Sequence, residues 1–344
     1  MGKEKKNSKD KKQKKKMKLW LKILLWILAI FIIGSIAFMV IQKDMFFYPS
    51  FDNESNTWLH NQSSFEEITI TTVDEDAVSS SLNMNTSTLS GWIKFNRPKT
   101  EKAPLIIYFG GNAQSSANTM RAFEVDGKFS STFKGYNFMY VDYPGYGLST
   151  GEPSDKSLFD AGIKIYDYAK MQKYVDKDNI IIVGYSIGTG VATYVTSKEN
   201  PKGLILIAPY DKGLSLYNGA INSFYGPMKS YARYKFNSSK EADKILCNSL
   251  IITSRDDEVI DYKLALKLAD HFEVEPELVI LEGVMHNQYF NRKAALDKIQ
   301  EYLTNNLPEE MLDGDGEIVE PEEEEQEETK TKTRKGIVKP RVVY

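Results

Sequence analysis

Short apolar runs alternate with longer stretches of helical periodicity through the middle of the chain. The runs lie at 104–109, 136–143, 180–183, 203–208, 249–254 and 277–281, and the helix-like stretches include 157–174, 189–198 and 291–306. Because buried strands that alternate with helices form sheets covered on both faces, this order predicts an α/β fold with a mostly parallel, doubly wound sheet. Two earlier strand-like segments, 65–72 and 90–95, are expected to form an antiparallel edge.

The N-terminus combines a basic segment with a long apolar one. Ten lysines fall between Lys3 and Lys18, and the predominantly apolar stretch 19–42 contains one charged residue, Lys22. Such a stretch is long enough to span a bilayer, and the positive-inside rule places residues 1–18 in the cytoplasm and the main domain outside the cell. A cleaved signal peptide is the alternative, but no small-x-small cleavage site is obvious. Since no aromatic-basic interleaving accompanies the lysines, we expect no nucleic-acid partner.

The composition divides the remainder into one domain and a tail. Residues 45–308 suffice for a single domain with a large core. Within it, 209–247 is interpreted either as a small cap over a pocket or as an ordinary crossover helix, and it is rich in aromatic residues: Tyr217, Phe224, Tyr225, Tyr231, Tyr234 and Phe236. Residues 309–344 are acidic and then basic, which is typical of disordered segments. The solitary Cys247 and the abundance of Lys, Ile and Asn favour a bacterial surface protein without an intrachain disulfide.

The segment 179–190 carries the clearest chemical signal. A β-branched run leads into Gly184-x-Ser186-x-Gly188, and a helical pattern follows. This is the sequence of a nucleophile elbow, in which a serine stands on a sharp turn between strand and helix. The glycines are expected because side chains there would collide with neighbouring backbone. Ser186 is therefore the candidate nucleophile.

A serine needs a base to take its proton, and the chain has three histidines. His60 precedes the elbow, and His271 lies in a helix-like stretch where an exposed imidazole is expected. His286 follows the apolar run 277–281 and a turn, which places it in a loop at the carboxyl end of a strand. His286 is the candidate base.

The carboxylate that would orient this histidine is expected after the strand 249–254. Three acidic residues follow there, Asp256, Asp257 and Glu258. Any of them could stabilise an imidazolium, and all three could instead form a solvated turn before the next helix. The pattern alone leaves this choice open.

Four sequence blocks together resemble the serine-aminopeptidase-like branch of the α/β-hydrolase superfamily, especially its membrane-anchored members. The blocks are 108–113, 141–154, the elbow, and 257–260 with 283–287; the resemblance extends over residues 46–303. It implies an α/β-hydrolase fold and selects Asp257 as the acid. It also implies an oxyanion hole built from the backbone N–H groups of Ile187 and of Gly111 or Asn112. Gly110 stands where the family usually has a histidine.

These features predict a membrane-anchored serine hydrolase that cleaves an ester, thioester or amide through an acyl-enzyme intermediate, with carboxylesters first. The expected partners are a small-molecule or lipid-like acyl substrate and the membrane, and no metal or cofactor is expected. The departure at Gly110 raises one alternative, a non-catalytic, membrane-tethered binding protein that keeps the hydrolase fold.

Overall fold

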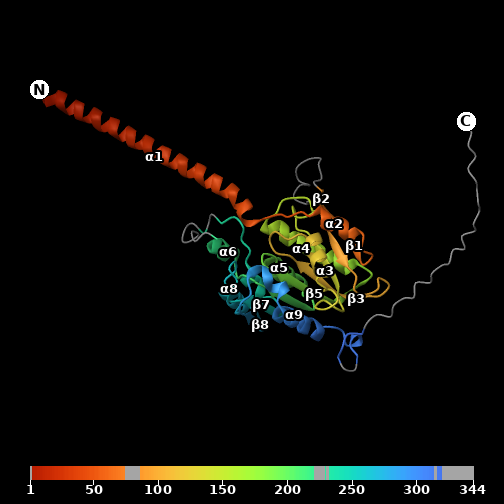
Figure 1. The fold of residues 1–344 in the computed structure, drawn as a ribbon. Coiled ribbons are helices and arrows are strands. Elements are labelled where there is room, and N and C mark those ends of the chain that lie inside the picture. The colour runs from red at the N-terminus through yellow and green to blue at the C-terminus, as the bar shows by residue number, and fades with distance from the viewer. Residues whose placement is uncertain (1, 74–85, 221–228, 230–231, 314–315, 320–344) are drawn as a thin grey trace, which may run out of the picture.

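The computed structural model describes residues 2–73, 86–220, 229, 232–313 and 316–319. One sheet forms the centre of the main domain, with helices packed on both of its faces, and the N-terminal helix α1 projects away from it (Figure 1). This architecture confirms the α/β fold that the alternation of strands and helices predicts, and it agrees with the α/β-hydrolase fold that the family resemblance implies.

The sheet contains eight strands in the order β1-β2-β4-β3-β5-β6-β7-β8. Strands β1 and β2 pair antiparallel, β2 is antiparallel to β4, and the remaining neighbours are parallel. The antiparallel edge predicted from 65–72 and 90–95 is therefore confirmed. The bounds are β1 Phe65–Val73, β2 Thr86–Lys94, β3 Ala103–Phe109, β4 Asn137–Val141, β5 Val175–Tyr185, β6 Gly203–Ile207, β7 Asn248–Ser254 and β8 Glu277–Leu281.

Alternate residues of the central strands serve two separate cores. On β5, Ile182 belongs to the core that includes α4 (Asp155–Met171), α5 (Gly188–Glu199) and α8 (Tyr262–Ala269). Its neighbour Ile181 belongs to the opposite core, with α2 (Asn53–His60), α3 (Ser116–Val125) and α9 (Lys293–Asn305). Because successive strand residues point to opposite faces, an uninterrupted apolar run is what a sheet covered on both sides requires.

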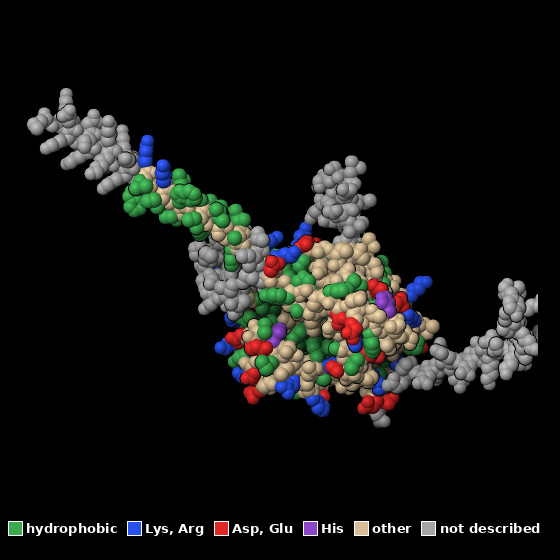
Figure 2. Space-filling view, turned by 45° about the horizontal axis from the view of Figure 1, so that its top comes forward, with side chains coloured by type: hydrophobic (Ala, Val, Ile, Leu, Met, Phe, Trp, Pro, Cys, Tyr) green, Lys and Arg blue, Asp and Glu red, His purple; other side chains and the backbone are tan. Residues whose placement is uncertain are grey.

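Helix α1 spans Gly2–Phe46, so the predicted apolar segment 19–42 and the basic segment before it form one continuous helix. Its stretch Lys18–Asp44 contains an 18-residue window with a mean hydropathy of 2.9 and is long and apolar enough to cross a membrane. Apolar side chains cover this stretch where it stands clear of the domain (Figure 2). The last residue of α1, Phe46, and the residue that follows it, Phe47, are instead buried in the core that includes α4 and α5.

In its described residues, the segment after β6 contains two short α-helices, α6 (Gly213–Ala220) and α7 (Ser238–Ala242). Tyr234 and Phe236 are buried, and both pack against Phe46 at ring centroid distances of 5.4 and 5.7 Å. These two aromatic residues of the predicted cap therefore hold the end of α1. Of the other aromatic residues in that prediction, Phe224, Tyr225 and Tyr231 lie outside the described residues.

The described residues of the predicted tail, 309–313 and 316–319, contact the domain. A 3₁₀ turn, η4 (Glu309–Met311), buries Met311, and Leu312 forms a β-bridge with Ile318. The guanidinium of Arg97 also donates to the carbonyl of Val319 across 2.6 Å. Apolar residues among the acidic ones thus attach this stretch to the domain, while the rest of the predicted tail, 320–344, lies outside the described residues.

Candidate active site

The candidate nucleophile Ser186 directly follows β5. Its φ of +54° lies in the left-handed region, so the backbone reverses sharply before α5 begins at Gly188. A Cβ on Gly184 would lie 2.6 Å from the Cβ of Ala192, and one on Gly188 would lie 2.1 Å from the carbonyl oxygen of Phe109. Both glycines are therefore required by the close approach of strand, turn and helix.

Three hydrogen-bonded side chains meet at the carboxyl ends of the parallel strands. Nε2 of His286 lies 2.9 Å from Oγ of Ser186, and Nδ1 of His286 lies 2.9 Å from Oδ2 of Asp257. Ser186 follows β5, Asp257 follows β7 and His286 follows β8. Since parallel strands end at the same edge of a sheet, residues far apart in sequence are brought together there.

The carboxylate of Asp257 is buried and accepts hydrogen bonds on both of its oxygens. Oδ1 accepts the N–H groups of Val259 and Ile260 across 2.9 and 2.8 Å, and Oδ2 accepts the hydroxyl of Tyr289 across 2.9 Å. Burial on its own would raise the pKa of Asp257, but the hydrogen bond and charge of His286 and the two N–H bonds outweigh it and lower that pKa. The group is therefore held as an anion beside the imidazole.

The two neighbouring acids contact other parts of the histidine loop. Oδ2 of Asp256 accepts the N–H of Gly283 across 2.6 Å, and Oε2 of Glu258 accepts the backbone N–H of His286 across 2.9 Å. The three carboxylates thus form different contacts, and only that of Asp257 reaches the imidazole ring. They do not form the purely solvated turn that the sequence left open.

Two tyrosines that the sequence pattern did not single out support the histidine. Tyr185 donates its hydroxyl to the carbonyl of His286 across 2.5 Å, and its ring stacks on the imidazole with centroids 5.4 Å apart. Tyr289 donates to Asp257 from the 3₁₀ helix η3 (His286–Asn291). Tyr185 lies beside Ser186 in sequence and Tyr289 three residues after His286, but neither position reveals the partner of its hydroxyl.

The turn after β3, residues 110–113, lies against the candidate nucleophile. A Cβ on Gly111 would be 3.4 Å from the Cβ of Ser186, and the N–H of Gly111 donates to Oε1 of Gln114 across 2.6 Å. Among the described residues, the N–H groups of Asn112 and Ile187 have no hydrogen-bond acceptor. Of the three predicted oxyanion donors, these two remain available to a ligand.

Gly110, the departure from the family pattern, has a steric cause. A Cβ at this position would lie 1.9 Å from the hydroxyl oxygen of Tyr140, whose buried ring fills the adjacent space. The hydroxyl of Tyr143 donates to the carbonyl of Gly110 across 3.0 Å. Large side chains from β4 and its following loop therefore brace the turn from outside, so the glycine itself does not leave it unsupported.

The other two histidines lie apart from this cluster. The ring of His60 packs edge-on against Trp92 with centroids 4.7 Å apart, and Nδ1 of the exposed His271 lies 3.2 Å from Oδ1 of Asp243. Neither contacts Ser186 or Asp257. The structure therefore brings only His286 to the candidate nucleophile.

A family of proteins with the alpha/beta hydrolase fold matches residues 104–227, which begin in β3 and include the elbow, β6 and α6. The sheet order and the position of Ser186 after β5 agree with that match. The chain belongs to the α/β-hydrolase superfamily. Esterase Pf2001 of Pyrococcus furiosus has the same fold, with a TM-score of 0.54 and 17% identity over 76% of this chain and 95% of that one. At this identity the likeness concerns the fold alone.

Curated sequence relatives are found within the same superfamily. The chain is 31% identical over 173 residues to alpha/beta hydrolase domain-containing protein 17C of Xenopus tropicalis, which is 50% of this chain and 54% of that protein. It is 29% identical over 167 residues to protein aho-3 of Caenorhabditis elegans, 48% of each chain. The chain thus spans about half the length of the curated relatives it matches. Both are animal proteins and lend no support to a bacterial origin.

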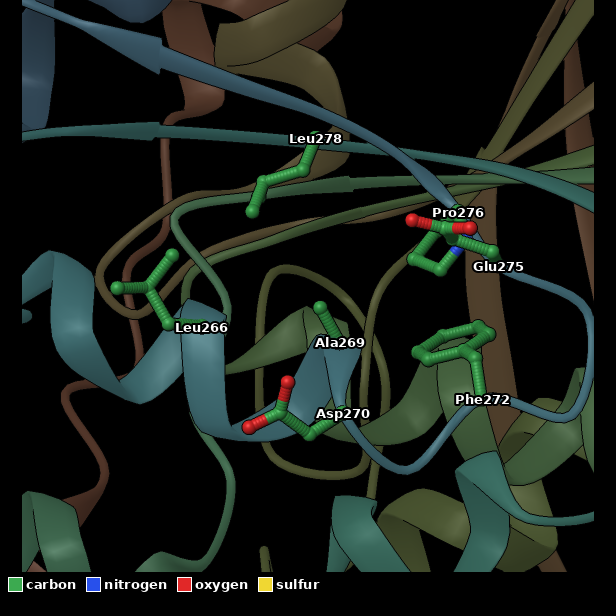
Figure 3. A pocket seen from close by; sticks show the side chains of 7 residues that line it. All are labelled: Leu266, Ala269, Asp270, Phe272, Glu275, Pro276 and Leu278. Atoms are coloured by element: carbon green, nitrogen blue, oxygen red, sulfur yellow. The ribbon is translucent and has the colours of Figure 1, made fainter.

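A hollow of about 350 Å³ lies at the opposite end of β8 from His286. Figure 3 shows its lining, which comes from α8, the loop after it and the start of β8: Leu266, Ala269, Asp270, Phe272, Glu275, Pro276 and Leu278. Because it is at the amino end of the strand, it is separate from the cluster around Ser186.

Proposed function

We propose that this α/β hydrolase is a membrane-anchored serine hydrolase that transfers an acyl group to water through an acyl-enzyme intermediate. The observation that supports it is the continuous hydrogen-bond chain from Oγ of Ser186 through both ring nitrogens of His286 to Asp257, each link 2.9 Å long. A serine hydroxyl bonded to an imidazole that is itself oriented by a buried carboxylate is the arrangement that activates serine as a nucleophile.

In the first half-reaction, Oγ of Ser186 attacks the substrate carbonyl carbon while Nε2 of His286 takes the hydroxyl proton. The imidazolium that forms is stabilised by Asp257, whose lowered pKa keeps it ionised. The N–H groups of Ile187 and Asn112 donate to the developing oxyanion. His286 then protonates the leaving group as the carbon–oxygen, carbon–sulfur or carbon–nitrogen bond breaks. Water repeats the sequence on the acyl-enzyme and regenerates Ser186.

The substrate class is an ester, thioester or amide, with carboxylesters first. The proposed acyl group is that of a small molecule or an amphiphilic lipid-like compound, because the apolar helix α1 runs directly into the core of the domain. An active site held close to a bilayer meets amphiphilic molecules at high local concentration. A panel of short and long acyl esters, acyl thioesters and aminoacyl amides would identify the class.

Labelling by a fluorophosphonate probe tests the proposal. The full chain in detergent micelles should become covalently modified, and Ser186→Ala should abolish both labelling and ester hydrolysis while leaving the melting temperature close to that of the wild type. Peptide mapping should place the adduct on Ser186. A wild-type chain that folds but neither labels nor hydrolyses any member of the panel would instead be the non-catalytic binding protein.

We also propose that α1 spans the cell membrane with residues 1–18 in the cytoplasm and the catalytic domain outside. The lysines at the start of α1 favour this orientation. A protease added to intact cells should digest the domain, including an epitope placed after Tyr344, but spare an epitope placed before Lys3. Release of a chain lacking its first forty or so residues into the medium would mean that α1 is a cleaved signal.

A further inference from the structure

The side chain of Asn112 connects the candidate oxyanion turn to the segment that leaves α1. Its Nδ2 donates to the carbonyl of Phe46 across 2.9 Å, and its Oδ1 accepts the backbone N–H of Tyr48 across 2.8 Å. The same Oδ1 accepts the hydroxyl of Tyr146 across 2.7 Å. Asn112 thus forms three side-chain hydrogen bonds, while its backbone N–H has no acceptor among the described residues.

The segment Phe46–Tyr48 is itself firmly held. Phe47 is 2% exposed and packs edge-on against Tyr234 with ring centroids 4.7 Å apart. Phe46 stacks on Phe236 at 5.7 Å, and the N–H of Gly147 donates to the carbonyl of Ser50 across 2.9 Å. The chain leaving α1 is thus a fixed part of the domain that presents one acceptor and one donor to Asn112.

The turn needs external restraint. Ala113 adopts a φ of +60°, a conformation that costs free energy for a residue with a side chain and persists only where neighbouring contacts enforce it. Gly111 is restrained by Gln114 and Gly110 by Tyr143. The hydrogen bonds of its side chain restrain Asn112, and with it the backbone N–H that we propose donates to the oxyanion.

We propose that the Asn112 side chain is a positioning residue, through which the segment Phe46–Tyr48 orients the Asn112 N–H for oxyanion stabilisation. This rests on the proposed serine-hydrolase function. The end of the membrane helix is then a structural part of the active site as well as an anchor, and disturbing it weakens transition-state binding more than substrate binding. Preorganised donors act in this way, because their orientation matters most when the negative charge develops.

The test measures kcat and KM for p-nitrophenyl acetate, together with the rate of fluorophosphonate labelling, on the full chain in detergent micelles. Asn112→Ala removes all three side-chain bonds but keeps the backbone N–H. We expect kcat to fall roughly 10-fold to 100-fold, less than the loss of a whole oxyanion donor, with KM changed by no more than about threefold. Labelling should slow by a similar factor as kcat and still reach completion.

A second variant separates this role from general stability. Phe47→Ala loosens the segment without touching the turn, and should lower kcat in the wild-type background. In the Asn112→Ala background it should have little further effect, because the connection is already cut. Phe47→Leu replaces it if the alanine variant melts below the assay temperature. Asn56→Ala is the matched control. Away from the site, Nδ2 of this buried asparagine donates to the carbonyl of Asp52, and its Oδ1 accepts the indole N–H of Trp92.

The outcomes distinguish the two proposals. Failure of the wild-type chain to label or turn over would overturn the serine-hydrolase function itself. Normal wild-type activity with kcat of Asn112→Ala within about twofold would overturn only the positioning role. The same conclusion would follow if the effects of Phe47→Ala and Asn112→Ala simply multiplied, or if Asn56→Ala lowered kcat equally.

Discussion

The hydroxyl of Tyr289 donates a hydrogen bond to Oδ2 of Asp257, across 2.9 Å, on the same oxygen that faces Nδ1 of His286. Burial raises the pKa of Tyr289, and the negative charge of Asp257 raises it further, so the phenol keeps its proton and remains a donor at neutral pH. Tyrosine and histidine therefore share one carboxylate oxygen, and the tyrosine fixes the position from which that oxygen orients the imidazole.

Replacing Tyr289 by phenylalanine should lower kcat/KM roughly 10-fold, because a hydrogen bond to a charged group contributes about 1.5–3 kcal/mol and part of this restrains Asp257. Steady-state hydrolysis of an ester by the full chain would measure it. Tyr136→Phe is the control, since its buried hydroxyl donates to the carbonyl of Leu303 away from the site. If both variants lose the same activity, the Tyr289 bond contributes to folding and not to the orientation of Asp257.

Replacing His286 by alanine should reduce kcat as severely as Ser186→Ala, because residues that act as a unit fail together. His271→Ala should stay close to wild type, since that exposed ring contacts Asp243 and no member of the cluster. Burst and steady-state kinetics on the two variants would test this. Equal losses at both histidines would leave the base unidentified.

Asp257→Asn should lower kcat by about 10³-fold or more, because an amide cannot stabilise the imidazolium and favours the wrong tautomer. Asp256→Asn should change kcat by less than about threefold, since its amide oxygen can still accept the N–H of Gly283. Both variants carry the same change of charge, so the comparison isolates position. The reverse result would move the proposed acid to residue 256.

The strands and the elbow could be predicted because their signals are local. A β-branched run, a glycine-flanked serine and a histidine after the last strand each depend on neighbouring residues, and parallel pairing then aligns the strand ends. The acid was harder to predict, because Asp256, Asp257 and Glu258 are chemically similar and adjacent. Only the three-dimensional loop assigns each a different partner, so the choice of Asp257 came from the family resemblance.

Contacts between distant segments could not be predicted. The space beside Gly110 is filled by Tyr140, and Asn112 bonds to Phe46, 66 residues earlier in the chain. No periodicity links such positions. For the same reason, the sequence did not predict that residues after 309 contact the domain. Met311 and Ile318 pack against its apolar residues although acidic residues lie beside them in the sequence.

The buried Asp142 should lower the free energy of unfolding as the pH rises, whereas an acid in a salt bridge raises it. Its carboxylate accepts the N–H and hydroxyl of Ser116, each across 2.6 Å. Burial nevertheless raises the pKa of Asp142 to about 7, against the lowering effect of these bonds. In the unfolded chain the pKa is about 3.9, so between these values the folded state binds more protons. Ionisation of Asp142 therefore destabilises the fold progressively as the pH rises from about 4 to about 7.

Asp142→Asn removes this titration while its amide can still bond to Ser116. The melting temperature of the variant relative to the wild type should therefore rise as the pH is raised from 4.5 to 7.5, and level off above that range. Thermal unfolding of the full chain in a non-ionic detergent at constant ionic strength would measure the difference. Asp160→Asn, at an exposed position of α4, is the matched control for the change from a carboxylate to an amide. A constant difference for Asp142→Asn would mean that Asp142 titrates alike in the folded and unfolded states.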